Sequence, residues 1–305
     1  MVNKISEINR LVKTDAKKFV LQVEEEYHNR IKKIAEEIKE KESVSIVLLA
    51  GPSAAGKTTS SNILCKHLGG MGIKTETLSL DDFYKTQEDM PRDEFGQLDF
   101  ERVDSLYIED IETCFKDLLE KGYTDAPIFN FKTKARESFT RKIELSTNGV
   151  VIVEGLHALN PVIIKNLPEQ KIFKLYISIG SGFIDSKDEM ILESRSIRLM
   201  RRMSIDIIYR NSPIERSLEL WSSVIRGEDK YLCPYRPSAH RELKSFHDYE
   251  ICLFKGILED KLKALDETVP NFDSVKKIIA AMNEAIVLNK EIIPENSLLK
   301  EFMHG

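Results

Sequence analysis

The chain has 305 residues, of which 42% are hydrophobic and 31% charged, and it carries a formal net charge of −5. Such a composition is ordinary for a globular protein, while the acidic balance argues against general binding to nucleic acid or anionic membranes, which requires an excess of Lys and Arg. The four cysteines form no C-x-x-C pair, and no apolar run approaches the ~20 residues of a membrane span, so we expect a cytoplasmic protein with reduced thiols.

Residues 1–42 combine dense charge with apolar residues at helical spacing. This pattern predicts one or two amphipathic helices. Both a docking arm and a helix that covers the main sheet remain open for this segment.

From residue 43 onward, short β-branched runs alternate with helical segments. Strands are predicted at 43–50, 73–80, 149–155 and 171–179, and helices at 57–69 and near 103–121. Strands that alternate with helices indicate an α/β fold with a parallel sheet and helices on both faces. Residues 126–131 and 138–145 are predicted to form a small antiparallel hairpin insertion, and 190–229, 254–263 and 273–288 to be helical.

The stretch "GPSAAGKTT" at 51–59 follows the first predicted strand and opens the first predicted helix of this region. It fits the phosphate-loop pattern G-x-x-x-x-G-K-[ST], in which backbone N–H groups and the lysine hold nucleotide phosphates and the Ser/Thr hydroxyl binds Mg²⁺. We therefore expect bound ATP and Mg²⁺, with the nucleotide contacted by Gly51, Ser53, Ala54, Ala55, Gly56, Lys57, Thr58 and Thr59.

A phosphate loop alone does not distinguish a switch GTPase, a motor ATPase and a small-molecule kinase. A GTPase would normally carry N-K-x-D for guanine, but Asn289 and Lys290 are followed by Glu-Ile and no Asp. The choice depends on which side chains accompany the γ-phosphate.

Acidic residues stand at the ends of two predicted strands. Asp81 and Asp82 follow the predicted strand within "ETLSLDDFYK", and Glu154 is the next-to-last residue of "GVVIVEG". Ligands of open α/β sheets bind beyond the carboxyl ends of strands, so we predict that Asp81 takes the proton of an acceptor hydroxyl; a cap of the next turn is the alternative for Asp81 and Asp82. Glu154 is predicted to hold Mg²⁺ through water or to polarise the reacting centre. His157 is either a pocket residue or a structural one.

"RSIRLMRRMSIDIIYR" places Arg195, Arg198, Arg201 and Arg202 three and four residues apart. Much of this charge lies along one side of a helix. The segment is either a solvated helix face or a mobile lid whose Arg202 and Arg210 close on the phosphates and exclude water.

Taken together, these motifs resemble the uridine kinase branch of the phosphoribulokinase/uridine kinase family, in a bacterial uridine kinase-like form. The matching stretches occur in family order: "GPSAAGKTT", "SLDDFYK", "LDFERVDSL", "PIFNFKTKAR", "VIVEGLHALN" and "RLMRRMSIDIIYRN". The resemblance implies transfer of the ATP γ-phosphate to the 5′-hydroxyl of a nucleoside. It also implies Asp81 as general base, Tyr84 as an aromatic of the nucleoside pocket, and Arg202 and Arg210 as lid arginines.

Several positions depart from the uridine kinase pattern. Phe129 and Lys134 stand where a Tyr and a His surround the base, Ile205 and Ser212 replace two lid arginines, and Glu101 replaces a ribose-contacting aspartate. The expected substrate-binding residues are Tyr84, Glu101, Phe129, Phe131, Lys134 and His157.

The first hypothesis is an ATP- and Mg²⁺-dependent pyrimidine nucleoside kinase that forms a homo-oligomer. A kinase of another acceptor such as a phosphopentose, and a non-catalytic ATP sensor, remain as alternatives. We expect an N-terminal helical arm at 1–42, a P-loop kinase domain at 43–265 and a C-terminal helical extension at 266–305.

Overall fold

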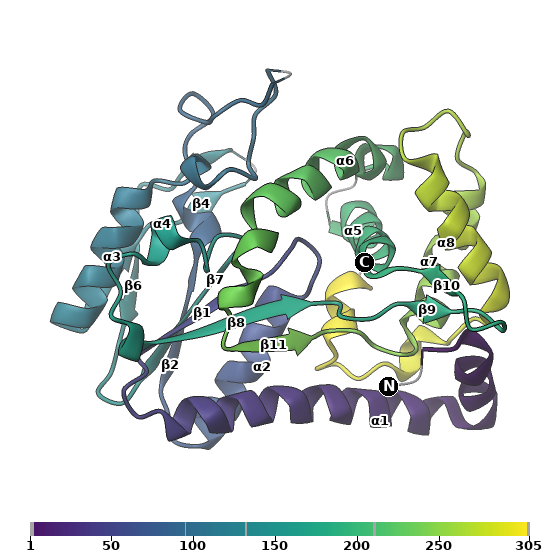
Figure 1. Ribbon diagram of the computed structural model, residues 1–305, viewed down its shortest axis with the longest axis horizontal. Helices are drawn as coiled ribbons and strands as arrows, with labels where there is room; N and C mark the ends of the chain where they lie inside the picture. Colours follow the sequence, from purple (N-terminus) through teal and green to yellow (C-terminus); the bar gives the residue numbers. More distant parts are fainter. Residues whose placement is uncertain (1–2, 95, 132, 210–211, 304–305) are drawn as a thin grey trace.

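A five-stranded parallel sheet forms the centre of the molecule (Figure 1). The computed structural model describes residues 3–94, 96–131, 133–209 and 212–303. Along the sheet the order is β11 (Arg241–Lys244), β8 (Ile172–Ser178), β1 (Ile46–Ala50), β7 (Val150–Gly155) and β2 (Thr75–Ser79). Every neighbouring pair in this order is parallel, which confirms the predicted fold class.

Helices cover both faces of this sheet. Ile46 and Leu48 of β1 share a core with α3 (Ile108–Lys121) and α4 (Pro161–Ile164). Val47 and Leu49, which point to the other face, share a core with α1 (Ile5–Glu40) and α2 (Lys57–Gly70). Burial from both sides explains why β1 reads as an uninterrupted apolar run and not as an alternating one.

The N-terminal segment is helical, as predicted. Helix α1 has 36 residues and is interrupted only at Asp15, whose φ of −161° and ψ of 88° are not helical. It runs along the lower edge of the molecule in Figure 1 and packs on α2 and the sheet. Within the described ranges, no helix is both long enough and apolar enough to cross a membrane.

The antiparallel insertion exists, but its predicted pairing is wrong. Residues 126–131 do not pair with 138–145 as one hairpin. Instead β3 (Tyr123–Ala126) pairs with β6 (Arg141–Glu144), and β4 (Phe129–Asn130) pairs with β5 (Ala135–Arg136). Pro127 lies between β3 and β4, and a residue that lacks an N–H group interrupts a strand ladder.

The predicted helical segment 190–229 begins with a strand. β10 (Met190–Leu192) pairs with β9 (Phe183–Ile184), and α5 (Ser194–Tyr209) and α6 (Ile214–Tyr231) follow. The next helices are α7 (Glu250–Lys263) and α8 (Phe272–Glu284), so the last predicted helix ends four residues early, because 285–288 are not helical. Short 3₁₀ turns occur at Leu80–Phe83, Val103–Ser105, Glu169–Lys171, Cys233–Ser238, Lys290–Ile292 and Leu298–Phe302.

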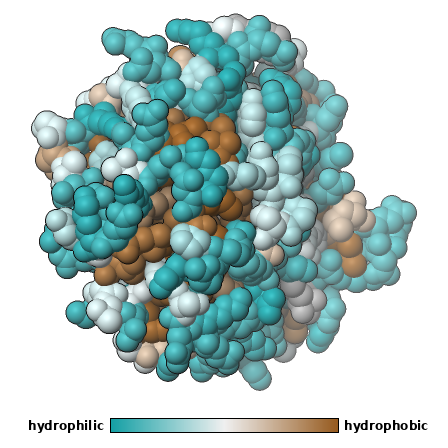
Figure 2. Space-filling view, turned by 60° about the vertical axis from the view of Figure 1, so that its left-hand side comes forward, coloured by the Kyte–Doolittle hydropathy of each residue, from teal (hydrophilic) through white to brown (hydrophobic). Residues whose placement is uncertain are grey.

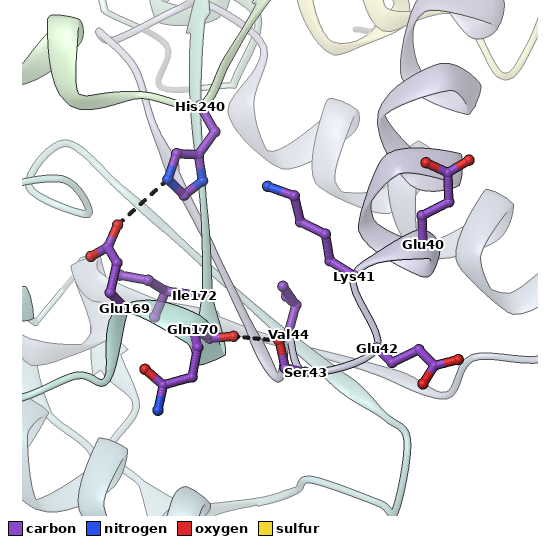
Figure 3. A pocket seen from close by; sticks show the side chains of 9 residues that line it. All are labelled: Glu40, Lys41, Glu42, Ser43, Val44, Glu169, Gln170, Ile172 and His240. Carbon is purple, nitrogen blue, oxygen red and sulfur yellow. Dashed lines mark hydrogen bonds and ion pairs between the residues drawn. The ribbon is translucent and has the colours of Figure 1, made fainter.

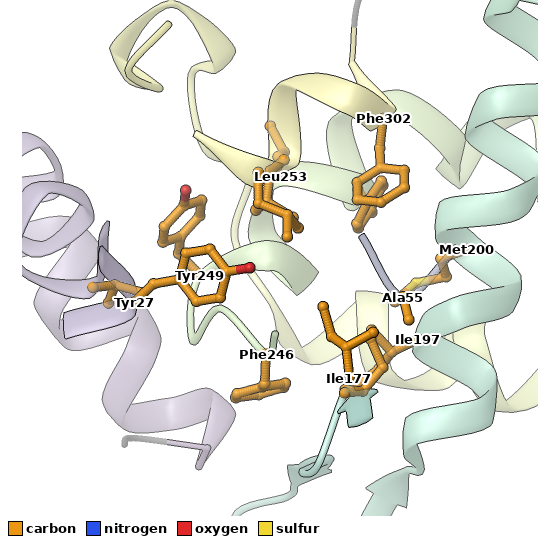
Figure 4. Packing of buried hydrophobic residues seen from close by; sticks show 14 of the residues in the cluster. Tyr27, Ala55, Ile177, Ile197, Met200, Phe246, Tyr249, Leu253 and Phe302 are labelled. Atoms are coloured by element: carbon orange, nitrogen blue, oxygen red, sulfur yellow. The ribbon is translucent and has the colours of Figure 1, made fainter. Parts of the chain in front are cut away.

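One hydrophobic core joins the two ends of the chain. It contains Ile5 at the start of α1 and Met303 near the C-terminus. In Figure 4 Phe302 lies near Met200 of α5, and Tyr27 of α1 lies near Tyr249. The division into an arm, a kinase domain and an extension is our proposal for the chain, and its three parts share this core.

Candidate active site

The loop between β1 and α2 forms an open anion cradle. Gly56 has a φ of 88° and Ala54 a φ of 58°, both in the left-handed region. Gly56 is the N-cap of α2 and offers no side-chain cap, and the first turn of α2 contains no acidic residue. Its N–H groups therefore lack a side-chain acceptor at the N-cap, and the helix dipole favours an anion there. These residues fit a nucleotide phosphate.

Lys57 and Thr58 lie at the mouth of this cradle. The Lys57 ammonium donates a hydrogen bond to the carbonyl of Pro52 at 3.2 Å, and the Thr58 side chain is exposed. Both side chains are thus within reach of a phosphate and its metal ion. The roles predicted for them stay predictions.

Two arginines of α5 brace the cradle from behind. Arg198 Nε donates to the carbonyl of Ser53 at 2.8 Å, and Arg201 Nη1 donates to the carbonyl of Ala54 at 3.4 Å. Arg198 is ion-paired with Glu228 and Arg201 with Glu250, both in the interior. A solvated helix face is therefore excluded for these two arginines, and they are too deeply fixed to move with a lid.

Arg202 is placed differently from its neighbours. Its Nη1 lies 3.5 Å from Ser53 Oγ, and its Nε lies 3.8 Å from Asp206 Oδ2. It therefore reaches the rim of the cradle, and its predicted charge-stabilising role stays a prediction. Arg210 lies outside the described residues, so its place in a lid stays a prediction.

We expect Arg201→Ala to destabilise the fold strongly. The arginine is fully buried, and its loss leaves the Glu250 carboxylate without its cation and the Ala54 carbonyl without a donor. Removing one partner of a buried pair costs about 3–5 kcal/mol. Urea unfolding measures this loss, with exposed Arg195→Ala as control; equal stability of the two variants would contradict the bracing role.

Asp81 and Glu154 meet at the carboxyl end of the sheet. Ser79 is paired with Glu154 between β2 and β7, and its hydroxyl donates to Glu154 Oε1 at 2.8 Å. Burial and the nearby Glu154 charge raise the pKa of Asp81 to about 6, although Lys57 acts in the opposite direction. Asp81 is thus suited to exchange a proton near neutral pH.

The Asp82 side chain binds the backbone of the insertion. Its Oδ1 accepts a hydrogen bond from the N–H of Phe129 at 3.1 Å and so fixes the start of β4. Of the two adjacent aspartates, Asp81 is therefore the one that faces Lys57 and Glu154.

The backbone of Glu101 lies next to the His157 ring. Burial, followed by the Glu228 charge, raises the pKa of Glu101 to about 7, whereas Arg202 lowers it. His157 is 2% exposed, and burial lowers the pKa of its imidazole to about 4. The backbone groups of Arg102 and Glu101 next to the ring act in the opposite direction and raise this pKa. His157 is therefore neutral and buried, while its contact with substrate stays a prediction.

Four aromatic rings gather next to Asp81. The ring of Tyr84 lies 5.7 Å from Phe100, 5.9 Å from Phe129 and 6.3 Å from Phe131, between centroids. The Tyr84 hydroxyl donates to the Phe100 carbonyl, and Phe131 is 61% exposed. The structure thus brings three predicted pocket residues together and adds Phe100, which sequence reasoning missed although it begins the motif "FERVD".

Three of the four described cations in the insertion are engaged outside this aromatic group. Arg136 pairs with Asp110 at 2.5 Å and lies over the Tyr107 ring. Arg141 donates to the Thr77 carbonyl at 2.8 Å, and Lys142 pairs with Glu144. Lys134 is exposed at a φ of 54°.

A cavity of about 800 Å³ lies elsewhere (Figure 3). Its lining includes Lys41, Val44, Glu169 and His240, at the amino ends of β1 and β8. Ligands of open α/β sheets bind at the carboxyl ends of strands, which is the opposite edge. This cavity therefore has no part in the candidate active site.

A parallel sheet, a phosphate loop after β1 and carboxylates at the ends of β2 and β7 define a P-loop kinase type of site. The model of the Phosphoribulokinase / Uridine kinase family matches residues 46–181. The match agrees with the family resemblance that the sequence motifs predicted.

The chain is also similar to curated proteins named uridine kinase. A uridine kinase of Ligilactobacillus salivarius is 27% identical over 181 residues, covering 59% of this chain and 75% of the relative. One from Staphylococcus aureus is 25% identical over 202 residues, covering 65% of this chain and 86% of the relative.

Solved structures also resemble the chain. A putative fructose transport system kinase from Silicibacter sp. TM1040 has a TM-score of 0.45 and 14% identity, covering 68% of this chain and 92% of that one. A possible uridine kinase from Bacillus stearothermophilus has a TM-score of 0.39 and 19% identity, covering 50% and 80% respectively.

Proposed function

We propose that the protein transfers the γ-phosphate of ATP to the 5′-hydroxyl of a pyrimidine nucleoside, uridine or cytidine. The observation that carries this proposal is the position of Asp81 between the phosphate-loop lysine and a group of aromatic rings. The family match of residues 46–181 and the relatives named uridine kinase support it.

Each group then has a physical role. The cradle and Lys57 hold the phosphates, Arg202 adds positive charge at the rim, and Asp81 accepts the proton of the attacking hydroxyl. Glu101 accepts hydrogen bonds from ribose hydroxyls. These roles are mainly positioning and charge stabilisation, as expected for phosphoryl transfer.

Thr58 and Glu154 would hold Mg²⁺, which supplies charge neutralisation for the phosphates when bound. The described part of the chain contains no group of three or more His, Cys, Asp or Glu that could hold a metal alone. Mg²⁺ commonly binds through one or two protein groups plus substrate phosphates and water, so the available oxygen donors fit it.

The charge around the acceptor position favours a neutral nucleoside over a phosphopentose. Asp81, Glu101 and Glu154 surround this position, while Arg136 and Arg141 are bound elsewhere. A phosphopentose carries about two negative charges and needs several free cations. Aromatic faces with a few directed hydrogen bonds suit a planar base instead.

We expect purified protein to release ADP with uridine or cytidine and not with ribulose 5-phosphate. Phe129→Ala should raise KM for the nucleoside about tenfold or more, because stacking on one aromatic face contributes about 1–3 kcal/mol. Lys142→Ala, at an exposed site in the same insertion, is the matched control and should change KM little. The acceptor assignment would be wrong if the parent protein phosphorylated ribulose 5-phosphate but neither nucleoside, and if Lys134→Ala abolished that activity.

A further inference from the structure

The C-terminal segment 297–303 lies directly against the phosphate loop. Its Leu298 side chain fills the space beside Gly56, where an added Cβ would overlap it. Its Glu301 accepts a hydrogen bond from the Thr59 hydroxyl at 2.6 Å. This segment is outside residues 46–181, so the family match does not account for the contact.

The backbone of this segment is firmly docked. The Ser297 hydroxyl donates to the buried Glu24 of α1 at 2.5 Å, and the Ser204 hydroxyl of α5 donates to the Phe302 carbonyl at 2.7 Å. Leu298 and Phe302 are fully buried. Releasing the segment would expose this apolar surface, so it stays in place while single side chains rotate.

Glu301 brings a negative charge to a site built for anions. Thr59 is the third residue of α2, in the first turn whose N–H groups have no side-chain acceptor at the N-cap. A phosphate bound there comes close to the carboxylate, and like charges repel strongly in a partly buried site. Burial raises the pKa of Glu301, whereas Lys57 and Arg201 lower it, which places the carboxyl within the field of the phosphate-binding lysine.

We propose that the Glu301 carboxylate competes with a nucleotide phosphate for Thr59 and for the positive field of the cradle, and thereby weakens nucleotide binding. The inference rests on the proposed nucleotide-binding function of the loop. Binding requires the Glu301 side chain to leave Thr59, while Leu298 and Phe302 keep the segment docked. The carboxylate thus sets how tightly the donor is held and how readily ADP leaves.

The test uses isothermal titration of the full chain with two probes, ADP and inorganic pyrophosphate. Glu301→Gln keeps the shape of the side chain and removes its charge. We expect it to bind both probes about tenfold more tightly, a change of about 1.4 kcal/mol. Glu291→Gln removes the same charge from an exposed position of the C-terminal region and serves as the control, with unchanged affinity.

The outcomes separate the possible roles of Glu301. Weaker ADP binding with unchanged pyrophosphate binding would make Glu301 a contact of the nucleoside part of the donor and overturn the competition. Unchanged affinity for both probes would also overturn it. If the parent protein binds neither probe while its circular dichroism shows a folded chain, the nucleotide cradle itself is wrong and the competition falls with it. Tighter binding in Glu301→Gln alone supports the proposal.

Discussion

Lys57→Ala should lower turnover about a hundredfold to a thousandfold while the protein remains folded. Lys57 is the cation at the mouth of the cradle, and removing one preorganised donor from a developing charge typically costs that much in kcat. Among the described residues its ammonium makes one hydrogen bond, to the Pro52 carbonyl, so the fold loses little. Steady-state kinetics with a saturating acceptor and thermal unfolding measure the two effects separately.

A matched control lies on the same helix. Lys66 is exposed on α2, and Lys66→Ala removes the same charge away from the cradle. It should keep parental kinetics. Near-parental turnover of Lys57→Ala would remove the phosphate-loop assignment from this chain.

Asp81→Asn should lower kcat about a hundredfold to ten-thousandfold and leave ADP affinity almost unchanged. The amide keeps the size of the side chain but cannot accept the proton of the acceptor hydroxyl. Asp82→Asn is the neighbouring control, because Asp82 bonds the Phe129 N–H and positions the insertion. Its main effect should be on KM for the acceptor. A larger loss of kcat in Asp82→Asn than in Asp81→Asn would identify Asp82 as the general base and Asp81 as the residue that positions the insertion.

The pH profile tests the same carboxylate. The base must be ionised, and the pKa of Asp81 is raised to about 6 by burial and by Glu154. Therefore kcat/KM should rise as pH increases through about 6 and reach a plateau above it. In Asp81→Asn the residual activity should no longer rise between acidic and neutral pH. If the pH profiles of the parent and the variant had the same shape, the rise would belong to another titrating group.

The local pattern of the sequence was sufficient to predict the first strand of the sheet, the phosphate loop and the helix that follows it. The run at 43–50, the loop at 51–59 and the helix behind it are adjacent in the chain, so their arrangement follows from hydrophobic patterning and glycine placement. Asp81 and Glu154 could be placed together because parallel strands end at the same edge of a sheet. The aromatic residues 84, 129 and 131 were predicted as pocket residues, and their rings do lie together.

Other strands and strand pairings could not be predicted, because the local sequence pattern does not specify them. Strand β11 reads "RELK", with a single apolar residue, and becomes a strand only because it pairs with the edge of β8. The pairing of β3 with β6 and of β4 with β5 depends on how the insertion folds around Pro127, which alternation of residue types does not specify.

By itself, the sequence determined the phosphate loop, the parallel sheet and the carboxylates at its edge, because each depends on residues close together in the chain or on a general rule of sheet geometry. Only the tertiary structure decided what holds the loop in place. Arg198 contacts Ser53 across 145 residues, and Glu301 contacts Thr59 across 242. Spacing and composition carry no record of such contacts, since they arise only when segments far apart in the chain pack together and their buried polar groups must find hydrogen-bond partners there.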